Sequence, residues 1–254
     1  MRIITLNTWG GRELQPLLEF FRRHASDTDV FCLQEVFDVD QASLDERHPD
    51  LKVRGDLFKL IAKELPGFEG SFAYFDDVPS RQSLAIFFRG DLPIKTVSDL
   101  VVYVPEVPIE HGSHVISSRK LQWLTLEHEG KELMIANFHG LWNGGPKTDA
   151  PERIEQSQKV KAQLAKHVGP IVLCGDFNLL PDTQSLAMLA EGLRDHVRES
   201  GVTSTRTPLY REYDDPSKPK FADYMLTSPE LKIAKFEVLP DVVSDHAPLM
   251  IEIL

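Results

Sequence analysis

A carboxylate and an amide stand two residues apart in the segment Gly175-Asp176-Phe177-Asn178, directly after an apolar run. The apolar residues 171–174 predict a buried strand, which the glycine interrupts. On an extended chain, residues two apart project to the same side, so both polar groups would face one site. There the carboxylate could take a proton from water while the amide fixes the geometry. Asp, Asn and Gly are also frequent in turns, and the motif on its own favours a plain turn.

Other side chains that could ligate a metal or move a proton also follow apolar runs. Glu35 comes shortly after the run 30–33, where an ionised carboxylate is costly unless it is paired, coordinated or solvated at a strand end. His139 follows the run 133–137, although a lone histidine in a loop is usually just exposed. The remaining polar groups at predicted strand ends are Asn7, Asp223, Asp245 and His246. Ligand sites in α/β proteins gather where strands give way to loops, so we expect these side chains to converge.

The elements that must position these residues follow from hydrophobic periodicity. Strands are expected at 2–6, 30–33, 72–75, 84–88, 100–104, 121–126, 133–137, 171–174, 222–226 and 249–254. Helices are expected at about 14–25, 57–65 and 151–168, with a short one after Thr183. Segment 38–54 is predicted to be irregular, and 200–220 to be a long surface loop. Without repeats or linkers, residues 1–254 are interpreted as one domain.

Composition narrows the class of protein further. The 254 residues carry a net charge of −11, which argues against a broad nucleic-acid-binding surface but not against a locally basic cleft or a metal site. Cys32 and Cys174 lie in apolar runs and are expected to be buried free thiols. No apolar segment is long enough to span a membrane, and no signal peptide is recognised. We therefore expect a cytoplasmic protein and a monomer.

Six ordered motifs resemble the endonuclease/exonuclease/phosphatase superfamily, which has the DNase I-like fold. They are LNTWGG at 6–11, LQEV at 33–36, NFHG at 137–140, GDFN at 175–178, ADY at 222–224 and SDHAPL at 244–249. Any one of them would be a weak signal, but their order and their span over nearly the whole chain make a strong one. The resemblance implies a four-layer α/β sandwich, in which helices flank two packed mixed β-sheets.

The resemblance also implies a metal site. Glu35 would be the principal carboxylate ligand of a divalent cation, Mg²⁺ or Mn²⁺, with help from Asn7 and Asp245. A small number of protein ligands suits Mg²⁺, which keeps several waters and takes oxygens from a substrate phosphate.

Catalytic roles follow from the same resemblance. Asp176 would orient or deprotonate the attacking water, and Asn178 would hold the phosphate. His139 and His246 would stabilise the crowded phosphoryl oxygens, His246 being oriented by Asp245. Asp223 would orient one of the two imidazoles, because a carboxylate partner fixes the tautomer and raises the basicity.

Three further residues bear on substrate and on departures from the family pattern. Gln82 stands near the position where DNase-like members have a glutamate partner for the catalytic histidine. Its amide could hydrogen-bond to His139 but would not support the charge of His139. Arg81 could bind a phosphate that is not cleaved. Trp142, in a Gly-rich loop with Asn143 and Lys147, could stack on a base or sugar, or could pack beneath the loop and hold it.

The predicted function is metal-dependent hydrolysis of a phosphodiester by in-line attack of water, as in a nuclease or small phosphodiesterase. The phosphoester substrate could be a nucleic acid or a small molecule. One alternative is a phosphatase of a small phosphorylated metabolite or headgroup. The alternative from another class is a non-catalytic binding domain, which the complete set of expected catalytic residues disfavours.

Overall fold

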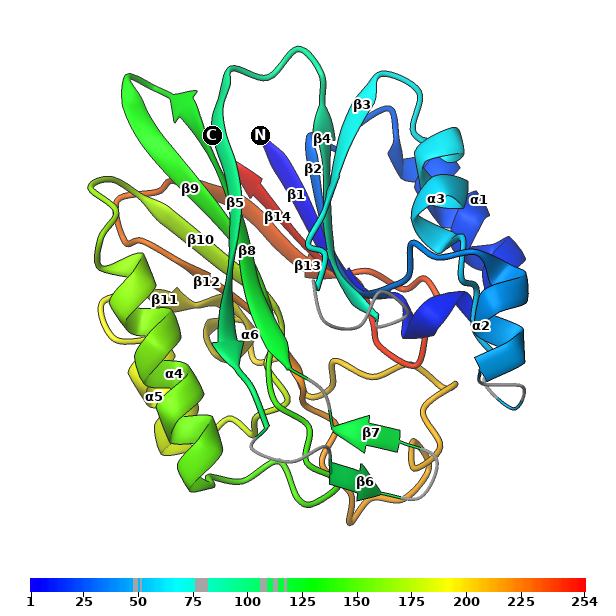
Figure 1. Ribbon diagram of the computed structural model, residues 1–254. Coiled ribbons are helices and arrows are strands. Elements are labelled where there is room, and N and C mark those ends of the chain that lie inside the picture. Colours follow the sequence, from blue (N-terminus) through cyan, green and yellow to red (C-terminus); the bar gives the residue numbers. More distant parts are fainter. Residues whose placement is uncertain (48–49, 51, 76–81, 106–108, 112–113, 117) are drawn as a thin grey trace.

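Two six-stranded β-sheets pack face to face, with helices on the outside (Figure 1). The computed structural model describes residues 1–47, 50, 52–75, 82–105, 109–111, 114–116 and 118–254. Because each sheet is covered by the other on its inner face and by helices on its outer face, the architecture is the predicted four-layer α/β sandwich.

The first sheet has the strand order β13-β14-β1-β2-β4-β3. Its strands are β1 (Arg2–Asn7), β2 (Val30–Val36), β3 (Phe68–Phe72), β4 (Ser83–Arg89), β13 (Ile233–Val238) and β14 (Leu249–Ile253). At its centre β1 runs parallel to β2 and antiparallel to β14, so the first and last strands of the described chain are neighbours.

The second sheet has the order β11-β12-β10-β9-β8-β5. Its strands are β5 (Ile94–Tyr103), β8 (Arg119–His128), β9 (Lys131–His139), β10 (Ile171–Asp176), β11 (Arg194–Asp195) and β12 (Asp223–Thr227). Here β9 and β10 are parallel, as β1 and β2 are in the first sheet. A separate two-stranded ribbon consists of β6 (Ile109–His111) and β7 (His114–Ile116).

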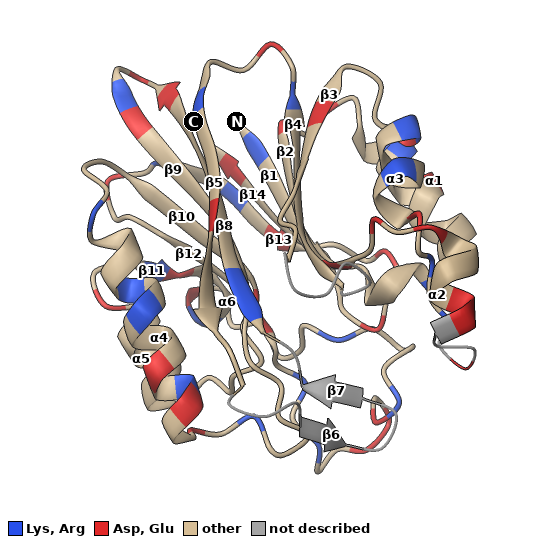
Figure 2. Cartoon of the chain, in the orientation of Figure 1, with Lys and Arg blue, Asp and Glu red and all other residues tan. Residues whose placement is uncertain are grey.

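The helices bury their apolar faces against the sheets. On the first sheet, α1 (Leu14–His24) and α3 (Leu57–Glu64) share one apolar cluster with the outer residues of β1 and β2. Beside the second sheet lie α4 (Pro151–Leu164) and α5 (Gln184–Leu189), and Figure 2 shows Lys and Arg interspersed with Asp and Glu along α4. The short elements are η1 (Trp9–Gly11), α2 (Gln41–Arg47) and α6 (His196–Glu199). No helix among the described residues has the length and apolar character needed to cross a membrane.

Three local predictions were wrong or incomplete, each where the apolar signal is weak. Segment 38–54 was expected to be irregular but contains α2, whose only fully buried apolar side chain is Leu44. The strand expected at 72–75 is β3, which ends at Phe72. The sequence pattern did not indicate β13, an edge strand with no fully buried residue.

A buried polar bridge joins the two sheets. Gln34 of β2 donates from Nε2 to Asn137 Oδ1 of β9 at 2.7 Å, and Asn137 Nδ2 donates to the carbonyl oxygen of Leu33 at 2.9 Å. Both side chains are inaccessible to solvent, so these bonds strongly constrain how the two sheets are positioned against each other. Cys32 and Cys174 are buried free thiols, as predicted.

Candidate active site

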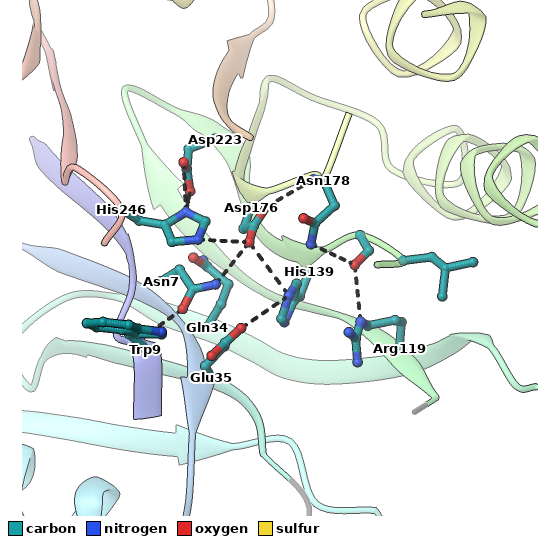
Figure 3. A network of polar contacts seen from close by, with 12 residues as sticks. Asn7, Trp9, Gln34, Glu35, Arg119, His139, Asp176, Asn178, Asp223 and His246 are labelled. Carbon is teal, nitrogen blue, oxygen red and sulfur yellow. Dashed lines mark hydrogen bonds and ion pairs between the residues drawn. The ribbon is translucent and has the colours of Figure 1, made fainter. Parts of the chain in front are cut away.

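Asp176 is the centre of a polar cluster to which both sheets contribute (Figure 3). Its Oδ2 atom accepts a hydrogen bond from Asn7 Nδ2 at 2.9 Å. The same oxygen lies 3.7 Å from His139 Nε2 and 3.6 Å from His246 Nε2. Since Asn7 ends β1 in the first sheet while His139 and Asp176 end β9 and β10 in the second, the cluster forms only when the sheets are packed together.

Glycines allow β9 and β10 to approach closely at this edge. A Cβ atom on Gly140 would lie 1.9 Å from the carbonyl oxygen of Phe177, and one on Gly175 would lie 2.0 Å from that of Phe138. Gly140 N also donates to the carbonyl oxygen of Asp176 at 2.7 Å. Only glycine fits these positions, which explains two of the glycines in the motifs.

Glu35 reaches the site through an irregularity in β2. The pairing of β2 with β4 shifts between Leu33 and Val36, and Glu35 has a φ of 56°. A β-bulge of this kind re-aims a side chain, and a non-glycine residue with positive φ stores strain that is typical of functional sites. The Glu35 carboxylate therefore turns toward the cluster, with Oε1 4.0 Å from His139 Nε2.

The expectation that Asp176 and Asn178 share one side of an extended chain is wrong. Asn178 has a φ of 52°, and its backbone N donates to Asp176 Oδ1 at 2.9 Å, which closes a turn on the aspartate side chain. Both residues nevertheless line the same pocket. The segment is thus a turn and part of the site at once, and Asn178 Nδ2 donates to the carbonyl oxygen of Gly140 at 3.3 Å.

The partner of His246 is Asp223, which was expected to orient one of the two imidazoles, and not Asp245. His246 Nδ1 lies 2.9 Å from both carboxylate oxygens of Asp223, whereas the nearest oxygen of Asp245 is 3.9 Å from Nε2. Asp245 is instead paired with Arg206, whose Nη1 donates to Oδ2 at 2.9 Å. The side chain that orients His246 is therefore Asp223, and Asp245 is held by a cation.

The two histidines have opposite electrostatic surroundings. Burial, and next the charge of the nearby Arg119, lower the pKa of His139 to about 3. Burial and Arg206 also act to lower the pKa of His246, but Asp223 and the other carboxylates outweigh them and raise it. No hydrogen bond joins Gln82 to His139, although both are described and both line the pocket. His139 is consequently neutral at physiological pH, whereas His246 carries charge more readily.

Asp176 stays ionised in this setting. Burial by itself would raise the pKa of its carboxyl, but the cationic neighbours, His246 first among them, hold the pKa well below its usual range. The opposite holds for Glu35, where burial and then the charge of Asp245 raise the pKa. Asp245 thus repels Glu35 even though it is itself paired with Arg206.

The chemistry of these donors fits a divalent cation. Glu35 and Asp245 supply mutually repelling oxygens, and Asn7 supplies Oδ1, which accepts from Trp9 N at 2.9 Å and has a second lone pair. A cation there would relieve the repulsion, and hard oxygen ligands suit Mg²⁺ or Mn²⁺. A second group, Asp176, Asp223 and His246, also has its ligand atoms within 4.8 Å of one another. That group is already satisfied internally by the His246–Asp223 bonds, which leaves Glu35, Asn7 and Asp245 as candidate ligands.

The cluster opens into a cavity of about 300 Å³. Trp142 lies in its lining, half-buried, together with Trp9 and Tyr210. Arg81 lies outside the described residues, so its predicted contact with a phosphate is not placed. The lining also contains cations for which the sequence indicated no separate role, namely Arg12, Arg119, Lys147 and Arg206. Nothing in the sequence separates these cations from ordinary surface ones, because they come from strands and loops far apart in the chain.

Comparison with known proteins concerns the family and the fold. The model of the family described as Endonuclease/Exonuclease/phosphatase family matches residues 4–246. Among curated proteins, the UPF0294 protein YE0917 of Yersinia enterocolitica is 29% identical over 127 residues, which are 49% of this chain and 44% of that protein. The match therefore spans less than half the length of this relative.

Solved structures show the same fold over the whole chain. The mannosyl-6-phosphatase Bt3783 of Bacteroides thetaiotaomicron aligns with a TM-score of 0.70 and 21% identity, covering 100% of this chain and 99% of that one. A functionally unknown protein of Enterococcus faecalis gives 0.72 and 17%, with 100% and 99% covered. Truncated TDP2 of Caenorhabditis elegans gives 0.66 and 17%, with 100% and 96% covered. At these identities the likeness concerns the fold alone.

Proposed function

The chain belongs to the endonuclease/exonuclease/phosphatase family, and we propose that it is a divalent-metal-dependent hydrolase of a phosphoester bond in a small substrate. The observation that carries this proposal is the convergence of Asn7, His139 and His246 on one carboxylate oxygen of Asp176. A buried ionised carboxylate between an amide and two imidazoles suits the handling of a water molecule beside a phosphate.

Asp176 has the geometry of the group that orients the attacking water. Its Oδ1 atom is fixed by Asn178 N and its Oδ2 atom by Asn7 Nδ2, so the carboxylate cannot rotate. Its depressed pKa keeps it ionised, and it takes the proton of the water as the attack on phosphorus proceeds. Preorganisation of this kind costs no further ordering when the substrate binds.

The imidazoles act on the phosphoryl oxygens. His246, whose charge Asp223 supports, stabilises negative charge that develops on the oxygens or on the leaving group. His139 is neutral and contributes a hydrogen bond without a full charge. A divalent cation held by Glu35, Asn7 and Asp245 would supply further positive charge for the phosphate oxygens.

The bond that is cleaved belongs either to a phosphodiester or to a phosphomonoester. The sequence favours a phosphodiester, whereas the excess of cations in the pocket favours the more highly charged phosphomonoester, as a phosphatase would use. Hydrolysis of bis-p-nitrophenyl phosphate and of p-nitrophenyl phosphate, each with Mg²⁺ and Mn²⁺, separates the two. A pocket of this volume suits a small molecule in either case.

The test of the proposal is the Asp176→Asn variant. We expect metal-dependent hydrolysis that disappears in excess chelator, and a fall in kcat of about 10²–10⁴-fold in the variant, measured at a temperature where the variant is folded. Asp182→Asn is the matched control, because it removes an exposed carboxylate six residues further along the chain. Hydrolysis that survives chelation, or a fully active Asp176→Asn, would refute the proposal. Absence of any hydrolysis in the unmodified protein would favour a binding domain.

A further inference from the structure

The pocket carries more positive charge than the proposed reaction requires. Its described lining includes three carboxylates, which are Glu35, Asp176 and Asp245, and four side chains of Lys and Arg. The cations thus outnumber the carboxylates before any metal ion is added, although the whole chain has a net charge of −11. Arg12 is exposed, whereas Arg119 and Arg206 are buried and Lys147 is half-buried, and a buried charge is costly unless it is neutralised.

Lys147 is one of these cations and has unused hydrogen-bond donors. It lies in the loop between β9 and α4, where its carbonyl oxygen accepts from Leu180 N at 2.9 Å. Its Nζ donates to the carbonyl oxygen of Phe221 at 3.3 Å, the one acceptor it has among the residues that the structure describes. Burial lowers the pKa of Lys147 to about 8, and the nearby Arg206 contributes. An ammonium group has three donors, so two remain for a ligand.

Arg206 is the second cation and belongs to the long loop between α6 and β12. Its side chain is only 5% exposed. Nη1 donates to Asp245, and the guanidinium lies over the ring of Tyr210 at 4.6 Å. Its Nε is buried without a hydrogen-bond partner among the described residues. The carboxylate of Asp245 therefore pairs with this guanidinium, and the ammonium group of Lys147 repels the guanidinium.

Neither cation is hydrogen-bonded or ion-paired to Asp176 among the described residues, although both are near enough to lower the pKa of its carboxyl. Lys147 is bonded to Phe221, two residues before Asp223, and Arg206 is bonded to Asp245, next to His246. The reacting phosphate already has Asn178, the two imidazoles and the metal site to bind it. The two cations are therefore placed to hold a different anionic group.

We propose that Lys147 and Arg206, with Tyr210 as a wall, form a second anion-binding subsite, and that the substrate is a small molecule with a second phosphate or carboxylate besides the ester that is cleaved. This inference rests on the proposed function for the identity of the first site. The limited volume of about 300 Å³ excludes a nucleic-acid duplex from filling the pocket and suits a compact molecule with two anionic ends.

Binding of matched phosphonates tests the subsite without any turnover. Propane-1,3-diylbisphosphonic acid has two anionic ends, propylphosphonic acid has one, and 3-phosphonopropanoic acid has a carboxylate as the second. Titration calorimetry, with Mg²⁺ and separately in chelator, should show about 10- to 100-fold tighter binding of a two-ended ligand than of propylphosphonic acid, because hydrogen bonds to charged groups are strong. Whichever two-ended ligand binds more tightly identifies the second group as phosphate or carboxylate.

Variants of Lys147 test whether this residue causes the tighter binding of two-ended ligands. Lys147→Met should reduce the ratio of the two affinities by about ten-fold or more, and Lys147→Arg, which keeps the charge, should retain most of it. Lys159→Met is the control, because that lysine is exposed on α4 and pairs with Glu155. Equal affinities for one-ended and two-ended ligands in the unmodified protein would overturn the proposal. So would a Lys147→Met variant that loses affinity equally for both, since Lys147 would then serve the reacting phosphate.

Turnover is measured separately, so that the two proposals fail independently. Release of phosphate from n-butyl phosphate and from butane-1,4-diyl bisphosphate gives kcat/KM for one-ended and two-ended esters. A binding preference without hydrolysis of either ester would leave the subsite standing and refute the hydrolase. Hydrolysis of both esters with equal kcat/KM and equal phosphonate affinities would leave the hydrolase standing and refute the subsite.

Discussion

The Nδ1 atom of His246 lies 2.9 Å from both carboxylate oxygens of Asp223. Among the described residues His139 has no such partner, since the nearest oxygens of Asp176 and Glu35 lie 3.7 and 4.0 Å from its Nε2. The site therefore combines one imidazole that is supported in its charged form with one that is kept neutral. The two histidines are unlike although both stand beside the same aspartate, and they should respond differently to mutation.

Asp223→Asn should destabilise the fold in a pH-dependent manner. The pKa of His246 is raised in the folded state, so its protonation stabilises the fold fully below its ordinary pKa of 6.5, and this stabilisation is lost as pH rises through the folded value. Removal of one partner of a buried ion pair costs about 3–5 kcal/mol. Urea denaturation should show that cost at about pH 6 and a smaller one at about pH 9. If the variant and the unmodified protein differ in free energy of unfolding by the same amount at every pH, the assignment of the charge to His246 is contradicted.

Glu35→Gln should abolish the response to metal and yet stabilise the metal-free protein. Because the folded pKa of Glu35 is raised, its ionised form destabilises the fold; this penalty is absent below the ordinary pKa of 4.5 and complete above the raised value. Thermal melts in chelator at neutral pH should rise by about 2–4 °C for each kcal/mol relieved. Addition of Mg²⁺ should raise the melting temperature of the unmodified protein and leave the variant unchanged. A variant that responds to Mg²⁺ as the unmodified protein does would exclude Glu35 as a ligand.

Trp142→Ala should weaken binding of substrate more than turnover. Trp142 lines the pocket, and stacking contributes equally to the ground and transition states, so its loss should raise KM by about ten-fold and change kcat little. Trp142→Phe keeps an aromatic face and should retain most of the affinity. Steady-state kinetics measure both parameters. An unchanged KM with a lower melting temperature would mean that Trp142 holds the loop and does not contact substrate.

Gly140→Ala should damage the site through the backbone. The new Cβ would lie 1.9 Å from the carbonyl oxygen of Phe177, so the ends of β9 and β10 must separate at a cost of about 1–3 kcal/mol. Activity should fall together with stability, because His139 and Asn178 flank the displaced segment. Gly145→Ala is the control, since its Cβ would meet only Asn143 Oδ1, at 3.4 Å. Equal melting temperatures for the two variants would show that the strands can separate without cost.

The parts of the fold that the sequence predicts are those with a strong apolar signal. Strands β1, β2, β9 and β10 are buried apolar runs, and α1 has a clear apolar face. Their existence could therefore be predicted, and the predicted ends lie close to the observed ones. α2 and β13 could not be predicted, because their few buried side chains leave no periodic pattern. Tertiary packing decides such elements.

The site was predictable as a set of residues but not as a geometry. Asp176, His139 and Glu35 stand at the ends of strands whose burial the sequence indicates, so their convergence could be expected. The sequence could not show that Asp223, and not Asp245, is the partner of His246, because both residues lie at strand ends. They differ only in that Arg206 approaches and neutralises Asp245. Burial of Lys147 and Arg206 depends on how two loops fold over the site, which no local pattern encodes.

The pairing of β1 with β14 has a consequence for the time at which the protein becomes active in a cell. Ribosomes add residues in order, so Asn7 and Glu35 leave the exit tunnel long before Asp245 and His246. β1 lacks one of its two neighbours until β14 is made, and the register from Arg2↔Glu252 to Thr5↔Leu249 can form only then. A nascent chain therefore carries an incomplete site until residues 245–253 have left the exit tunnel. Hydrolysis should not begin before that point.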